Sequence, residues 1–124
     1  MSLLVRSFPL QGPMPEFDAF VAALKGPKAN EAAAFYQAHG IAHESWHLQQ
    51  TPHGPWVIVV SMMRDPPASA PQYALASDEF ASWFKGQVLT LSGVDPSRNP
   101  LGPPTTEVFH WTANAEMAKA IACA

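Results

Sequence analysis

Histidine side chains on a predicted strand are the groups in this sequence best suited to chemistry. Residues 41–50 are expected to form a strand, and His43 and His47 then share one face because side chains alternate between the two faces. Histidine titrates near neutral pH, so either residue is a candidate to donate or accept a proton inside a pocket. The competing interpretation makes both of them polar residues of a solvent-facing edge strand or of an interface.

A shared zinc site for three histidines is disfavoured by their spacing along the chain. His39, His43 and His47 recur every fourth residue, as ligands on one helix would, but Gly40 separates a predicted helix from the strand. On a strand, His43 and His47 stand about 13 Å apart, at roughly 3.3 Å per residue. Zinc ligands must converge to about 2 Å from the metal. We therefore expect no metal site and no cofactor.

Tryptophans and one further histidine lie on the predicted edge strands. Trp46 belongs to the strand over 41–50, and His110 and Trp111 belong to a predicted strand over 105–112. Aromatic side chains often line small-molecule pockets, although they also fill cores and dimer interfaces, and a buried, hydrogen-bonded His110 is the simpler alternative. His47 and His110 are the candidate catalytic residues. The candidate ligand-binding residues are His43, Trp46, His47, His110 and Trp111.

Several classes of function are disfavoured by what the sequence lacks. The motifs GxGxxG, GxxxxGK[ST], GxSxG and HExxH do not occur. The single cysteine, Cys123, has no activating neighbours and cannot form an intrachain disulfide. The net charge is -3, and the seven basic residues are scattered from Arg6 to Lys119. We expect neither nucleic acid nor a membrane as a partner.

The elements that must position these residues alternate along the chain. Apolar residues with helical spacing predict a helix from about residue 17 to 39, either kinked or divided at Lys25-Gly26-Pro27. A second helix is predicted to begin at Ser77 as its N-cap and to end at Gly93. Prolines predict a turn over 65–71 and a loop over 95–104. Strands are predicted over residues 3–8, 41–50, 56–63 and 105–112.

The order βαββαβ predicts an α+β fold of the ferredoxin-like kind. Two right-handed crossovers give a sandwich with a four-stranded antiparallel sheet and helices on one face. It occupies residues 1–112, and 113–124 form an alanine-rich tail. The apolar run Trp56–Val60 indicates a central strand that is buried on both faces. Because helices cover only one face, a second subunit's sheet is the natural cover for the other, which predicts a homodimer.

One stretch of the sequence resembles a known family. AFYQAHGIAHESWHLQQTPHGPWVIVV, within residues 31–63, is similar to small uncharacterised bacterial proteins of the dimeric α+β barrel class. The shared pattern is a glycine stop at Gly40, an aromatic-leucine pair at Trp46 and Leu48, a Thr-Pro-x-Gly hairpin and an apolar strand. A matching helix, FASWFKGQV, follows. The resemblance implies a dimeric α+β barrel, whose wider superfamily includes cofactor-free monooxygenases, haem enzymes and binding or regulatory domains.

Three functions remain open from the sequence. The first is a non-catalytic binding or regulatory module. The second is an enzyme of the cofactor-free monooxygenase or isomerase type, with an apolar pocket lined by tryptophan and histidine for a small apolar or aromatic ligand. The third is a haem binder. Residues 1–10 are too short and interrupted for a signal peptide, and the longest apolar run is far short of a membrane span, so we expect a cytoplasmic protein.

Overall fold

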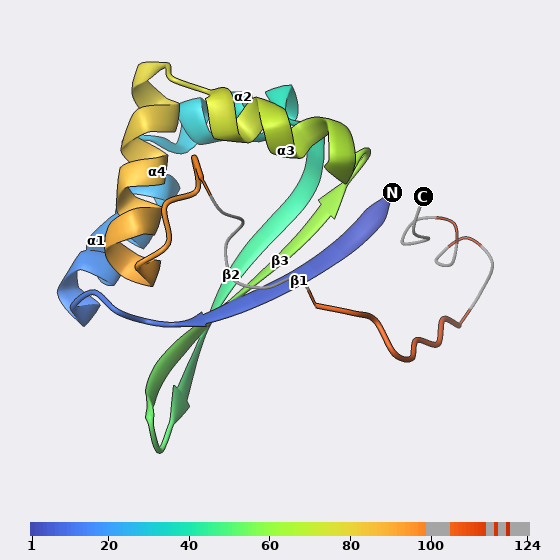
Figure 1. Ribbon diagram of the computed structural model, residues 1–124, viewed down its shortest axis with the longest axis horizontal. Helices are drawn as coiled ribbons and strands as arrows, with labels where there is room; N and C mark the ends of the chain where they lie inside the picture. Colours follow the sequence, from blue (N-terminus) through green and yellow to red (C-terminus); the bar gives the residue numbers. More distant parts are fainter. Residues whose placement is uncertain (99–104, 114–115, 117–118, 120–124) are drawn as a thin grey trace.

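The protein is an α+β structure with an open three-stranded sheet and four helices among its described residues. The computed structural model describes residues 1–98, 105–113, 116 and 119. The helices gather on one side of the sheet (Figure 1). In chain order the elements are β1 (Ser2–Pro9), α1 (Met14–Lys25), α2 (Ala29–Ala38), β2 (Ile41–Thr51), β3 (Gly54–Met63), α3 (Pro66–Leu75) and α4 (Glu79–Ser92).

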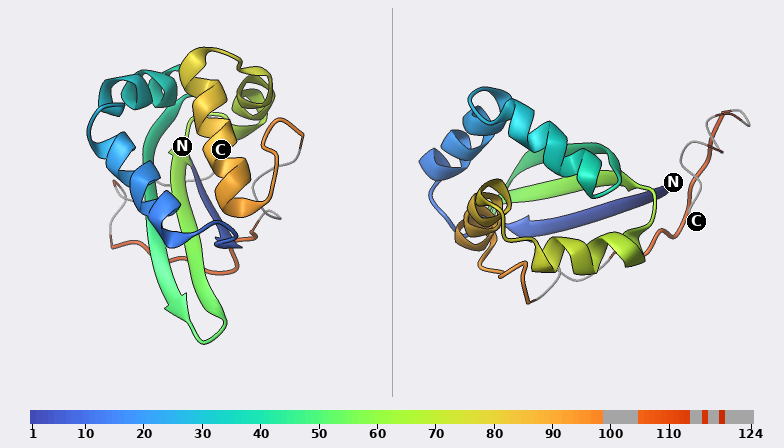
Figure 2. Two further views of the ribbon diagram at one scale, coloured as in Figure 1. Left: turned by 90° about the vertical axis from the view of Figure 1, so that its left-hand side faces the viewer. Right: turned by 90° about the horizontal axis from the view of Figure 1, so that it is seen from above.

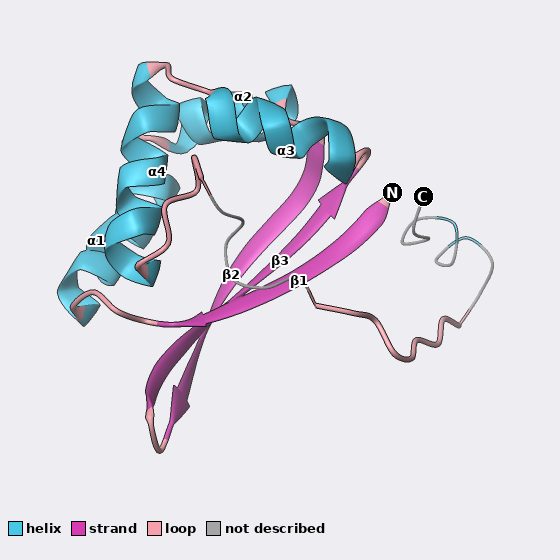
Figure 3. Ribbon diagram, viewed as in Figure 1, coloured by secondary structure: helices cyan, strands magenta, loops and turns pink. Residues whose placement is uncertain are grey.

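The sheet is antiparallel, with β3 between β1 and β2. The central position of β3 confirms that part of the prediction from its apolar run, whereas burial on both faces is not seen in the single chain, because Ile58, Val60 and Met62 on the second face are only partly buried. The β2–β3 hairpin closes at Gly54, whose φ of +107° suits glycine, and the Thr51 hydroxyl donates to the Gly54 carbonyl at 2.6 Å. The end of this hairpin projects beyond the helices (Figure 3).

The hydrophobic core lies between the helices and one face of the sheet. Phe8, Val57 and Val59 are the buried strand residues of this core, and they point to the same side. Helices α1 and α4 bring Phe20 and Leu91 against them. The opposite face of the sheet carries the partly accessible side chains Leu3, Val5, Ile58, Val60 and Met62. The two further views show the helices packed around a single face (Figure 2).

Helices α1 and α2 are separate, which settles the alternative left by the sequence. Helix α1 ends at Lys25, and the Lys28 amide turns back to the Ala23 carbonyl at 2.9 Å. Helix α2 ends before Gly40, whose positive φ of 70° stops the helix as predicted. No helix in the described part of the chain has the length and apolar character needed to cross a membrane.

Helix α3 occupies the stretch predicted as a turn, so that prediction is wrong. Pro66 and Pro67 lie in the first turn of the helix, where backbone N–H groups make no intrahelical hydrogen bond and their absence in proline costs nothing. Asp65 caps the helix by accepting from the Ala68 amide at 3.3 Å. The N-cap of α4 is likewise Asp78 rather than Ser77, since its carboxylate accepts from the Ala81 amide.

The predicted strand over 105–112 does not form in this structure. The Thr105 hydroxyl donates to the Val5 carbonyl of β1, but no ladder of pairs continues from that contact. Val108, Phe109 and Trp111 are 91, 83 and 77% exposed. Alternating residues make a strand only when one face packs on something, and these side chains have no such surface in the single chain. Of the predicted tail 113–124, only Ala113, Glu116 and Lys119 are described.

Candidate functional site

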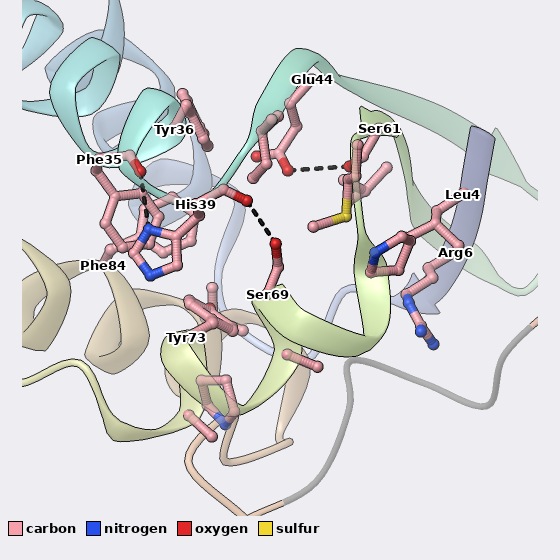
Figure 4. Close-up of a pocket in the computed structure, with 18 of the residues that line it drawn as sticks. Leu4, Arg6, Phe35, Tyr36, His39, Glu44, Ser61, Ser69, Tyr73 and Phe84 are labelled. Atoms are coloured by element: carbon pink, nitrogen blue, oxygen red, sulfur yellow. Dashed lines mark hydrogen bonds between the residues drawn. The ribbon is translucent and has the colours of Figure 1, made fainter. Parts of the chain in front are cut away.

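A pocket of about 500 Å³ opens between the sheet and helices α2, α3 and α4. Its walls are mostly apolar and aromatic, with a few polar groups, and its volume is within the usual range of about 300–1,000 Å³ for small-molecule sites. Figure 4 shows the polar groups along the pocket. The lining residues are Leu4, Arg6, Phe35, Tyr36, His39, Ile41, Glu44, Trp46, Val59, Ser61, Met63, Pro66, Ser69, Ala70, Pro71, Tyr73, Ala74, Phe84, Val88, Pro96, Ser97 and Arg98.

Glu44 places a carboxylate in this pocket from the edge strand β2. Its neighbour across the sheet is Ser61 of β3, whose hydroxyl donates to Glu44 Oε1 at 3.0 Å. The Trp46 indole N–H, two residues along the same face, donates to Oε2 at 3.0 Å. A carboxylate has about four acceptor sites, so these two donors leave room for others. The two hydrogen bonds therefore fix the group without saturating it.

Two phenols share the pocket with this carboxylate. Tyr36 comes from α2 and Tyr73 from α3. Burial raises the pKa of the Tyr36 phenol, and the charge of Glu44 and a hydrogen bond with it raise that pKa further. Burial and then the charge of Glu44 also raise the pKa of Tyr73. Both side chains are therefore neutral phenols near neutral pH, able to donate a hydrogen bond.

His39 adds an imidazole at the end of helix α2. Its Nδ1 lies 2.8 Å from the Phe35 carbonyl, and since a carbonyl only accepts, Nδ1 must carry the hydrogen. Nε2 of the neutral ring is then an acceptor. The ring packs on Phe35, with centroids 4.3 Å apart, and meets Tyr73 edge-on at 6.1 Å. Ser69 of α3 holds the same corner by donating to the His39 carbonyl at 2.6 Å.

The structure does not bring the five sequence-derived candidates together. Trp46 lines the pocket and is partly buried. His43 and His47 are exposed on the opposite face of β2, where His47 Nε2 lies 2.9 Å from Ser45 Oγ. His110 and Trp111 are exposed in the segment 105–112, outside the pocket lining.

The pocket's other polar residues were not singled out as site candidates from the sequence. Glu44 did carry a signal, because the period of two puts it on the same strand face as Trp46 and Leu48, which are apolar. A charge on an apolar strand face must be solvated by the protein or point into a pocket. Tyr36 and Tyr73 carried no comparable signal, because Tyr36 sits in an ordinary helical pattern and Tyr73 follows residues predicted as a turn.

Comparison with other proteins gives no information on function. No protein-family model, curated protein or solved structure matches the chain. Within the described residues, no three histidine, cysteine, aspartate or glutamate side chains group closely enough to hold a metal ion.

Proposed function

We propose that this protein binds a small, largely apolar organic molecule in the pocket between the sheet and α2, α3 and α4, with a donor group of the ligand directed at Glu44. The observation that carries the proposal is a fixed carboxylate with spare acceptor capacity in an aromatic cavity of about 500 Å³. An apolar cavity with a few oriented polar groups is the usual form of a small-molecule site. The apolar walls supply affinity, and Glu44 supplies orientation.

The pocket is tested by blocking it from an exposed position. Ala70 of α3 lines the pocket but is exposed, so Ala70→Trp places an indole in the cavity without entering the core. We expect 2-naphthol, an aromatic probe with one hydroxyl, to raise the melting temperature of the wild type, because a ligand that binds only the folded state stabilises it. The Ala70→Trp variant should keep its fold and lose this shift.

Ala68→Trp is the matched control for the blocking variant. Ala68 is exposed on the same helix but does not line the pocket. It should retain the shift produced by 2-naphthol. An equal shift in wild type, Ala70→Trp and Ala68→Trp would place probe binding elsewhere on the protein and contradict the proposal.

We also propose that two copies associate through the sheet face that the helices leave uncovered. Its apolar side chains Leu3, Val5, Ile58, Val60 and Met62 lie on the neighbouring strands β1 and β3, on the face opposite the pocket. Such a surface favours association with another apolar face. In this arrangement residues 105–112 become the fourth strand beside β1, completing a ferredoxin-like sheet. The hydrogen bond from Thr105 to Val5 supports that position.

Sedimentation equilibrium tests this association. The wild type is expected at twice the mass of one chain, and Val60→Lys, which puts a charge in the apolar face, is expected as a monomer. Leu75→Lys is the matched control, because Leu75 is 81% exposed on α3, away from the sheet face. A wild type at the mass of one chain, or a Val60→Lys variant that stays a dimer, would contradict the association and leave the pocket proposal intact.

A further inference from the structure

The hydrogen-bond partners of the Glu44 carboxylate are uncharged groups. The hydrogen-bond donors to its carboxylate are the Trp46 indole, the Ser61 hydroxyl and the Tyr36 phenol, and none of them carries a charge. Neutral donors satisfy the oxygens but leave the negative charge in place. A ligand that brings a positive charge gains a charge-assisted hydrogen bond there, which is shorter and stronger than one between neutral groups.

Aromatic rings surround the same end of the pocket. Tyr36 and Trp46 are hydrogen-bonded to the Glu44 carboxylate. The other aromatic residues that line the pocket are Phe35, Tyr73 and Phe84. The faces of such rings attract cations. Such contacts already occur in this protein, since Lys28 Nζ lies 4.7 Å from the Trp83 ring centre and Lys85 Nζ lies 5.7 Å from that of Tyr73. An aromatic wall with one carboxylate is suited to an ammonium group.

Charged residues of both signs line different parts of the pocket. Arg6 and Arg98 also line it, and in Figure 4 Arg6 lies on the side away from Glu44. The Arg98 side chain is 82% exposed and lies 3.7 Å from Asp95, so it belongs to the solvent side. A ligand with one positive end is expected to place that end at Glu44, because Glu44 is the one carboxylate among the described residues that line the pocket.

From this arrangement we propose that the ligand is a protonated amine on an apolar or aromatic body, with the ammonium at Glu44 and the body against the aromatic wall. The inference rests on the proposed function of the pocket. It adds the charge of the ligand, which the volume and apolar walls alone do not specify.

Three probes of nearly equal size test the charge of the ligand by calorimetry. They are 2-phenylethylamine, 2-phenylethanol and 3-phenylpropionate, which carry a positive, a neutral and a negative end. We expect the amine to bind about tenfold or more tightly than the alcohol, given the added charge-assisted hydrogen bond and cation–π contacts. The acid should bind more weakly than the amine, because its carboxylate is repelled by Glu44 and cannot form the charge-assisted hydrogen bond there.

The variant Glu44→Gln should reduce the amine to the affinity of the alcohol. It keeps the shape of the side chain, and Ser61 Oγ is able to accept from the new amide nitrogen, so the fold is retained. Glu31→Gln is the matched control, because Glu31 is exposed on α2 outside the pocket; it should bind like the wild type.

The possible results separate this inference from the proposed function. If the alcohol or the acid binds as tightly as the amine, the ligand is not an amine, although the pocket still binds small molecules. If the amine's advantage survives Glu44→Gln, the carboxylate is not its partner and the inference is overturned. If none of the probes binds, both the inference and the proposed function are contradicted.

Discussion

Replacing Phe20 with alanine is expected to cost about 3–5 kcal/mol of the free energy of unfolding, measured by urea denaturation. Phe20 is 1% exposed and is one of the largest fully buried side chains. Its ring lies 5.2 Å from Trp46 and 5.7 Å from both Trp83 and Phe84, measured between centroids. Removing it leaves a cavity between α1, α4 and the sheet. A small domain has only about 5–15 kcal/mol to lose, so the effect is large.

A large apolar side chain at an exposed position serves as the control. Leu75 of α3 is 81% exposed, and Leu75→Ala should change the free energy of unfolding by about 0.5 kcal/mol or less. Should Phe20→Ala fail to fold, Phe20→Leu keeps most of the buried volume and should show a smaller loss in the same direction. Equal losses for Phe20→Ala and Leu75→Ala would contradict the packing described for α1.

Alkaline titration of the tyrosines is expected to differ sharply from that of free phenols. The chain contains two tyrosines, Tyr36 and Tyr73, so tyrosinate absorbance reports on the pocket alone. Burial and the charge of Glu44 raise the pKa of both phenols well above the ordinary value of about 10. We expect little tyrosinate in the folded protein at pH 10–11, and its absorbance should rise together with unfolding.

The sign of the linked stability change follows from these raised pKa values. The folded state holds both phenolic protons more tightly than the unfolded state, so the contribution is fully present below about pH 10 and is lost as the pH rises beyond it. Glu44→Gln removes the charge but not the burial, and should move the titration of Tyr36 and Tyr73 part of the way back toward pH 10. Titration near pH 10 with an intact circular dichroism spectrum would show that neither phenol is buried as described.

The parts of the fold that follow from local pattern could be predicted from the sequence. The apolar run of β3 indicated a central strand, and Gly40 and Gly93 marked the ends of α2 and α4, each with a positive φ. The segment 105–112 shows the limit of such reasoning. Its alternation is that of a strand, but pairing depends on a partner surface, which no local pattern can supply.

The candidate site was less predictable, because a pocket is defined by which elements face each other. Helix α3 forms one wall, and its prolines indicated a turn, because the sequence does not show that Pro66 and Pro67 fall where a helix tolerates them. Without α3 there was no reason to associate Tyr73 with Tyr36. The histidines His43 and His47 lie on the face of β2 opposite the pocket, whereas Glu44 lies on the pocket face together with Trp46.

The central claim is that the pocket beside Glu44 is a small-molecule site, and an NMR titration of ¹⁵N-labelled wild-type protein tests it most directly. With 2-phenylethylamine as the probe, we expect saturable shifts of backbone amides around the pocket, at Glu44, Ser61, Ser69 and Tyr73, while the amide of His53, at the far end of the β2–β3 hairpin, stays unchanged. Shifts confined to the end of the hairpin, or no saturable shifts with either this amine or 2-phenylethanol, would contradict the claim.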